Sequence, residues 1–207
     1  MLGTASAQIT GIGKYTGVIN KEFRIVPYTM SWCLDEKDTL IQLTKKTFVY
    51  NGKNQPVKLK VNCSLPSAFI EGKDYTISYP TGNKTVGTHK AVIKCKGNYS
   101  ESGTYTFTIV PKGTSIKKLK AGKKSFTVTW KAQKVQTSGY EIQYALNSKF
   151  TKSRKTVRVN KPATTKKTIK KLKAKKKYYV RIRTYKTVGG KRYYSAWSKT
   201  KTIKTKK

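Results

Sequence analysis

The stretch that decides the fold of the second half of this chain is Leu172-Lys173-Ala174-Lys175-Lys176-Lys177-Tyr178-Tyr179-Val180-Arg181-Ile182-Arg183. Its last six residues alternate between an apolar set, Tyr178, Val180 and Ile182, and a second set that carries both arginines. Side chains of a strand point to its two faces with a period of two. The pattern therefore predicts a β-strand that buries one face in a core and presents arginine on the other.

The neighbouring segments show the same alternation. The apolar positions of two further strands are Phe126, Val128 and Trp130, then Tyr140, Ile142 and Tyr144. Short strands are expected at 156–159 and 168–172, and a last strand from Ala196 to Ile203 after the turn at Gly189-Gly190. Threonine, valine, isoleucine and tyrosine, which favour strands, dominate between the lysines. We therefore expect an all-β protein made of tandem β-sandwiches.

These landmarks resemble a fibronectin type III domain over about 114–205. The resemblance rests on the Trp130 strand, the Tyr-x-Ile-x-Tyr strand and the Leu-x5-Tyr-x-Val-x-Ile block that begins at Leu172. It implies a two-sheet core in which Tyr178 is a tyrosine corner, its hydroxyl bonding to backbone near Leu172. The expected core residues are Trp130, Tyr140, Ile142, Leu172 and Tyr178.

Charge divides the chain into two unequal halves. The 207 residues hold 46 Lys+Arg and 8 Asp+Glu, a net charge of +38. Residues 1–111 carry 14 of the cations and 7 acids, whereas residues 112–207 carry 32 cations and one acid, Glu141. Such a step indicates a boundary between units of different surface chemistry, and Pro111-Lys112-Gly113 is the expected linker.

An internal repeat organises the first half. A shift of 84 positions places residues 3–27 on 87–111 without a gap, with ten identities in 25 aligned residues. Each copy predicts a strand, a turn and a second strand. In the first copy the apolar face would hold Ala5, Ala7 and Ile9 with Phe23 and Ile25. A lone hairpin is marginal in water, so we expect this one to dock on the following module or on another chain.

Four blocks between residues 41 and 111 resemble a bacterial Ig-like repeat found in surface proteins of Gram-positive bacteria. They are Phe48-Val49-Tyr50-Asn51-Gly52-Lys53, Gly72-Lys73-Asp74-Tyr75-Thr76-Ile77-Ser78-Tyr79, Val86-Gly87-Thr88 and Gly97-Asn98-Tyr99. The match covers about 41–111 and departs at Cys95, where the family pattern and the first copy (Gly11) have glycine. The expected domains are the end of an Ig-like repeat (1–27), a complete Ig-like repeat (28–111) and a fibronectin type III domain (112–207).

Three cysteines are too few for a disulfide scaffold and lack the spacing of metal ligands. Cys63 continues the inward phase of its strand, and Cys95 continues that of Ala91 and Ile93. A bond between Cys63 and Cys95 could cross the sandwich, as the bridge between sheets does in antibody domains. Two reduced core thiols, or a pairing with Cys33, are the alternatives.

The sequence contains few residues and motifs of the kinds that catalysis uses. There is one histidine, His89, and no Gly-rich phosphate loop, nucleophile elbow or metal-binding histidine motif. No stretch approaches the ~18 apolar residues that cross a bilayer. We expect a non-catalytic protein with no cofactor, no metal site and no membrane span.

The candidate binding residues lie in the second half. Lysine clusters that could contact anionic polymers are Lys117, Lys118, Lys120, Lys123, Lys124, Lys170, Lys171, Lys173, Lys175, Lys176 and Lys177. Arg181, Arg183 and Trp197 form a second group, since guanidinium groups stack favourably on an indole. Ser195-Ala196-Trp197-Ser198 resembles half of the tryptophan–serine motif of cytokine-receptor domains, where such stacking stiffens the sheet.

The resemblances imply an extracellular module on a bacterial surface, joined to further modules of a longer protein. Its cationic domain would bind anionic cell-wall polymers, or acidic host glycans or matrix. Nucleic acid is a further alternative, because tyrosines are interleaved with the basic residues. The lysines could also serve only to keep a long extracellular protein soluble.

Overall fold

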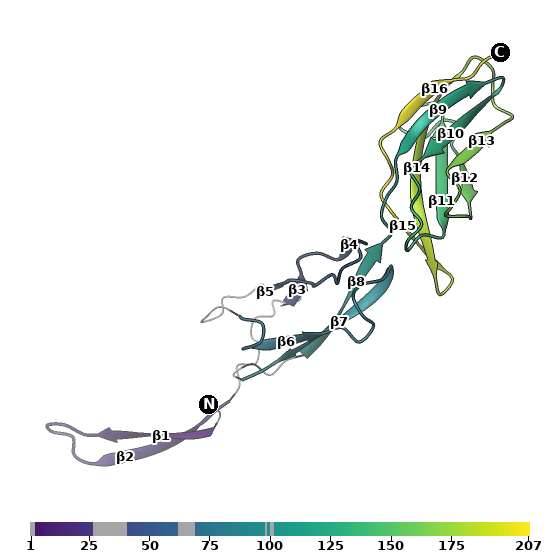
Figure 1. Ribbon diagram of the computed structural model, residues 1–207. Helices are drawn as coiled ribbons and strands as arrows, with labels where there is room; N and C mark the ends of the chain where they lie inside the picture. Colours follow the sequence, from purple (N-terminus) through teal and green to yellow (C-terminus); the bar gives the residue numbers. More distant parts are fainter. Residues whose placement is uncertain (1–2, 27–40, 62–68, 98, 100–101) are drawn as a thin grey trace. The chain divides into compact units, whose positions relative to one another are not determined.

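The computed structural model describes residues 3–26, 41–61, 69–97, 99 and 102–207. These residues form the strands β1 to β16, and no helix occurs among them (Figure 1). The all-β prediction is therefore confirmed. Contacts between Cα atoms divide the chain into two compact units: residues 1–46, 57–81 and 90–106, and residues 47–56, 82–89 and 107–207. The domain boundaries expected from the sequence stay predictions.

The second half of the chain builds two antiparallel sheets. A three-stranded sheet has the order β13 (Lys166–Ile169), β10 (Ser125–Trp130) and β9 (Ile116–Gly122). The other sheet has the order β12 (Lys155–Val159), β11 (Gly139–Ala145), β14 (Lys177–Val188) and β15 (Lys191–Tyr194), and β16 (Lys201–Lys204) also pairs with β14.

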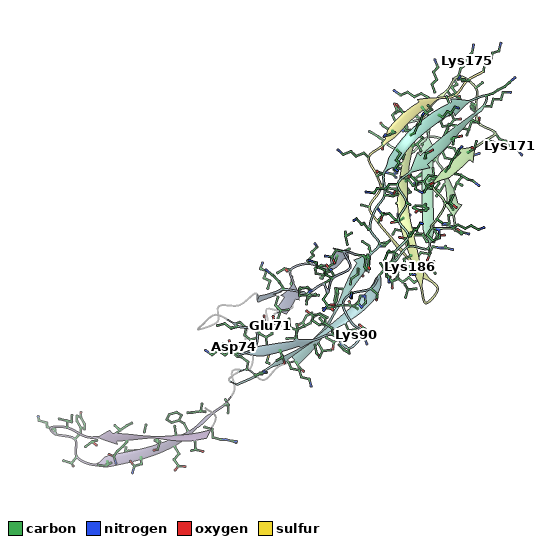
Figure 2. The ribbon with its side chains drawn as sticks, in the orientation of Figure 1. Glu71, Asp74, Lys90, Lys171, Lys175 and Lys186 are labelled. Atoms are coloured by element: carbon green, nitrogen blue, oxygen red, sulfur yellow. The ribbon has the colours of Figure 1, made fainter. Side chains whose placement is uncertain are left out.

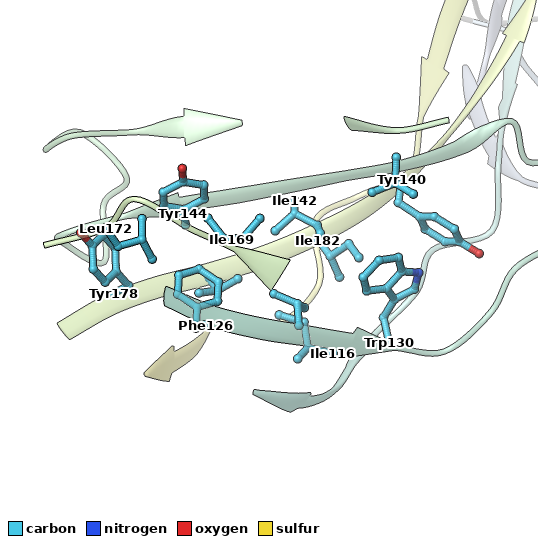
Figure 3. Packing of buried hydrophobic residues seen from close by; sticks show 13 residues of the cluster. Ile116, Phe126, Trp130, Tyr140, Ile142, Tyr144, Ile169, Leu172, Tyr178 and Ile182 are labelled. Carbon is cyan, nitrogen blue, oxygen red and sulfur yellow. The ribbon is translucent and has the colours of Figure 1, made fainter. Parts of the chain in front are cut away.

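One hydrophobic cluster joins the inner faces of these two sheets (Figure 3). Trp130 on β10 contacts Tyr140 on β11, with ring centroids 5.2 Å apart. All five residues expected in the core are buried there: Trp130, Tyr140, Ile142, Leu172 and Tyr178. The alternating apolar residues of each sheet face those of the other sheet, so the two sheets pack as a β-sandwich.

The tyrosine corner fixes the entry into β14. The oxygen of Tyr178 accepts a hydrogen bond from the backbone N–H of Lys173 at 3.1 Å. Its ring packs beside Phe126, with the centroids 5.9 Å apart. The loop before β14 is therefore held to the core by a residue of β14 itself.

The prediction of a last strand from Ala196 to Ile203 is confirmed only for its end and is wrong for residues 196–200. Residues 195–200 form no strand, and β16 begins only at Lys201. The serine hydroxyls explain the difference, because Ser195 Oγ accepts from the N–H of Thr184 and Ser198 Oγ accepts from the N–H of Ile182, both at 3.1 Å. Between these two bonds the chain advances three residues, from Ser195 to Ser198, while β14 advances two, which interrupts the regular antiparallel register.

The first half contains shorter pairings. β3 (Ile41–Leu43) pairs with β5 (Leu59–Val61), β4 (Thr47–Val49) pairs in parallel with β8 (Ser102–Val110), and β6 (Tyr75–Ser78) pairs with β7 (Gly87–Cys95). Tyr75, Ile93 and Tyr99 form a small buried cluster in the first unit. His89 is buried against Phe107 in the second unit, with one ring nitrogen 2.7 Å from the carbonyl oxygen of Thr85. This histidine therefore has a packing role.

The repeat brings identical residues into different surroundings. β1 (Gly3–Thr10) and β2 (Val18–Ile25) form a hairpin, as predicted, in which Ala5 lies opposite Phe23. Ile9 and Phe23 are 61% and 53% exposed there. Their counterparts in the second copy, Ile93 and Phe107, are 0% and 1% exposed. The first hairpin therefore displays an apolar face of the kind that the second copy buries.

Docking of this hairpin on another chain predicts that its protection from amide exchange increases with protein concentration. We expect slower exchange over residues 3–25 in concentrated than in dilute protein, measured by hydrogen–deuterium exchange. F23K, which removes the largest apolar side chain of the face, should abolish the increase, since burying a phenylalanine contributes about 1.5–3 kcal/mol. N20K, on the opposite face, is the matched control. Rapid exchange throughout residues 3–26 at every concentration would contradict the docking.

Candidate functional site

The structure gathers lysines from three segments at one end of the sandwich. The turn between β9 and β10 meets the loop before β14, where the N–H of Leu172 donates to the carbonyl of Lys124 at 2.9 Å. The last residues of the chain join them, since Lys206 N–H donates to Gly122 O at 3.0 Å and Thr205 N–H to Lys176 O at 3.0 Å. Backbone hydrogen bonds therefore hold together segments that are far apart in the sequence.

We call this region the lysine end and define it by Lys123, Lys124, Lys171, Lys173, Lys175, Lys176 and Lys206, all of which are exposed. Figure 2 shows the side chains of Lys171 and Lys175 reaching outward there. Three of these lysines, Lys124, Lys171 and Lys175, have positive φ angles of 42°, 57° and 55°. Non-glycine residues rarely adopt this region, so tight turns determine where these charges lie.

A second group of lysines covers the outer face of the three-stranded sheet. Lys118 of β9 and Lys166 of β13 both lie opposite Thr129 of β10, and Lys120 lies opposite Thr127. Residues directly opposite each other in an antiparallel pair share a face. Lys117 is exposed and has no partner residue in β10, because the register shifts between Thr129 and Trp130. Lys170 and Lys177 flank the lysine end in the sequence and are also exposed.

Arg181, Arg183 and Trp197 come together elsewhere, on the outer face of the other sheet. The indole of Trp197 lies between the two guanidinium groups, 4.6 Å from that of Arg181 and 4.3 Å from that of Arg183. Phe150 stacks on Arg181 at 4.1 Å, and Tyr194 stacks on Arg183 at 3.8 Å. This ladder of alternating cations and rings belongs to the sheet and lies apart from the lysine end.

The acid that the second half contains, Glu141, lies beneath this ladder. It lies on the outer side of β11, but its side chain is covered, and the residue is only 2% exposed. Arg158 Nε and Arg183 Nη2 approach its two oxygens at 2.8 Å and 2.7 Å. Burial acts to raise the pKa of Glu141, but the hydrogen bonds and charges of Arg183 and Arg158 outweigh burial and hold that pKa below its ordinary value.

Sequence reasoning missed two parts of the site. The burial of Glu141 could have been suspected, because it alternates with Tyr140 and Ile142 on a strand whose partner strand carries arginines. The convergence of the lysines had no local signal, because it depends on backbone bonds between 122–124, 172–176 and 205–206.

Two of the three cysteines considered for a disulfide lie outside the described residues. Cys63 and Cys33 are not described, and Cys95 lies at the end of β7, half-buried against the Tyr75 cluster. The pairing of Cys63 with Cys95 stays a prediction. In the part of the chain that the structure describes, no group of three or more His, Cys, Asp or Glu side chains could hold a metal ion.

Glu141→Gln should destabilise the sandwich at neutral pH and matter less in acid. A carboxyl whose folded pKa is depressed stabilises the fold above its unfolded pKa of about 4.3, and this contribution is lost as the pH falls through the folded pKa. We expect a loss of about 1–3 kcal/mol at pH 7, reduced because both arginines are partly exposed, and a smaller loss near pH 3. Urea unfolding followed by tryptophan fluorescence measures it. Glu71→Gln, at an exposed carboxylate, is the control, and an equal loss at both pH values would contradict the assignment.

The second half of the chain matches a known protein family. The sequence pattern of the fibronectin type III domain matches residues 109–201. No curated protein matches the chain. No helix of the described residues has the length and apolar character needed to cross a membrane.

Several solved structures are similar to the chain. Chicken CNTN1 domains FN1–FN3 are 15% identical with a TM-score of 0.42, over 97% of this chain and 76% of that one. A myokine structure is 18% identical with a TM-score of 0.35, over 45% of this chain and 93% of that one. A redesigned β-sandwich protein is 16% identical with a TM-score of 0.35, over 46% and 90%.

The sheets, the core and the family pattern coincide over the second half of the chain. Modules of this family are usually extracellular and typically serve as structural or binding units without catalytic activity. Residues 109–201 of this chain form a fibronectin type III domain.

Proposed function

We propose that the protein is a non-catalytic extracellular module of a bacterial cell surface, in which the lysine end binds anionic polymers. The observation that supports the proposal is the convergence of seven exposed lysines from three segments, in a half-chain whose acid is buried. Like charges held together attract polyanions, and the attraction is strongest at low ionic strength. The preceding residues 1–111 would form the Ig-like spacer of a stalk.

Polyol-phosphate polymers of the cell wall, such as teichoic acid, fit the lysine end better than nucleic acid does. Lysine offers a point charge to phosphate, whereas arginine offers the planar fork that reads bases. Three of the aromatic residues that could stack on bases are occupied: Trp197 and Tyr194 lie against arginines, and Tyr185 is buried with its hydroxyl donating to Asn160 at 2.7 Å. Acidic host glycans stay the second candidate, since they carry the same sign of charge.

Charge reversal at the lysine end should remove binding selectively. We expect K123E/K176E/K206E to weaken binding to teichoic acid at least about tenfold, because each lost contact also removes released counterions. K134E/K161E/K191E has the same net charge and changes exposed lysines in loops that follow β10 and β12 and in β15. This control should lose less than about threefold in the same buffer.

Competition at equal salt separates the partners. Purified wall sacculi, teichoic acid, mucin and duplex DNA are offered together, and the bound fraction of each is measured. We expect sacculi and teichoic acid to compete best. Retention of duplex DNA over all others, with a sequence preference, would overturn the proposal, and so would equal binding by the two triple variants.

A further inference from the structure

A small pocket opens beside the lysine end, between the loop after β11 and the loop before β14. Its volume is about 160 Å³. A cavity of about 10–15 Å³ holds one water molecule, so the pocket has room for a ligand of several non-hydrogen atoms. Leu146, Leu172 and the rings of Tyr144 and Tyr178 provide its apolar walls. Figure 3 shows Tyr144, Leu172 and Tyr178 together at one end of the core cluster.

The charged residues that line this pocket are all lysines. Lys155, Lys171 and Lys173 line it together with the hydroxyl of Ser153, and no carboxylate lines it. Three ammonium groups without an acid make it a site of net positive charge. Anionic ligands are therefore the class that it favours.

Tyr144 gives the more specific sign of a ligand. The residue is 6% exposed, and its hydroxyl makes no hydrogen bond with any residue that the structure describes. This hydroxyl is not among the fully buried polar atoms of the described residues, so it is open to the pocket and can donate to a ligand there. Burial and the neighbouring Tyr178 raise the pKa of Tyr144, so the phenol keeps its proton at neutral pH.

Tyr178 supplies a second donor of the same kind. Its oxygen already accepts the N–H of Lys173 at 3.1 Å, which leaves its own proton for an acceptor. Both phenols therefore offer protons beside three ammonium groups.

The walls of the pocket are fixed before any ligand binds. Asn147 Oδ1 accepts from the N–H groups of Thr151 and Lys152 at 3.0 Å and 2.9 Å, which holds the loop that carries Ser153. Ser153 and Lys171 have φ angles of 51° and 57°. A non-glycine residue in the left-handed region on each of the two loops that border the pocket shows that tertiary contacts determine its shape.

We propose that this pocket binds one phosphodiester group of a polyol-phosphate polymer, with Tyr144 and Tyr178 as hydrogen-bond donors and Lys155, Lys171 and Lys173 as charge partners. Donors that approach from three strands, β11, β12 and β14, and from the loop before β14 suit the tetrahedral phosphate better than a planar carboxylate. The apolar walls contact the short carbon chain between phosphates. This inference rests on the proposed function, for which it names the repeating unit that is recognised.

The test is an NMR titration of the full chain with glycerophosphoglycerol. We expect saturable shifts at Tyr144, Ser153 and Lys171, and Tyr144→Phe should raise the Kd about tenfold, as expected for a lost bond to a charged group. Tyr179→Phe, at a tyrosine of β14 outside the pocket, is the matched control. Glucuronate and a thymidine dinucleotide of the same charge should bind more weakly. Tighter binding by either one, or an equal Kd in Tyr144→Phe, would overturn the proposal.

Unfolding separates a binding role from a structural one. Because the Tyr144 hydroxyl has no internal partner, Tyr144→Phe should keep the urea midpoint of the ligand-free protein, while saturating ligand stabilises the wild type more than the variant. A lower midpoint without ligand would show a structural role instead. Lys123, Lys176 and Lys206 do not line the pocket. If the polymer binds through these three lysines but glycerophosphoglycerol causes no saturable shifts, only the proposal for the pocket is overturned. If the wild type binds no polymer, the proposed function is overturned.

Discussion

The buried ion pairs of Glu141 determine how charge is distributed over the second half of this chain. One carboxylate is available to 32 cations, and the fold places it under the sheet surface, between Arg158 and Arg183. Each of these bonds crosses from β11 to a neighbouring strand, so the acid joins β12, β11 and β14. The exposed lysines of residues 112–207 consequently have no acid from their own half of the chain beside them.

Segregation of arginine from lysine follows from the same constraint. Arginine can stack on rings and bond to a carboxylate with a planar group that is weakly hydrated, and the ladder uses it in this way. Lysine is strongly hydrated and stays at turns and on the outer sheet face. The domain therefore has two cationic surfaces of different character: one is internally satisfied and rigid, and the other is open to solvent.

Much of the fold could be predicted from sequence, because strands have local signals. The alternation of Phe126, Val128 and Trp130 predicts a buried face whatever the partner strand is. The bend at Ser195 and Ser198 could not be predicted in this way, because it requires side-chain hydroxyls to replace backbone partners across the sheet. The pocket beside Tyr144 was missed for a similar reason: Tyr144 alternates like a core residue, and only the loops above it leave its hydroxyl open.

The serine-bonded segment also affects how the sheet can interact with other molecules. β14 pairs with β15 near its end and with β16 near its start, and Ser195 and Ser198 occupy the N–H groups between these pairings. A single returning chain thus covers one whole side of β14. Since residues 195–200 are not a strand, they offer no regular row of donors and acceptors to a foreign strand. At the high local concentration of a tandem array, this irregular segment would resist the strand addition that begins aggregation, and the charges of Lys199 and Lys201 would add to that resistance.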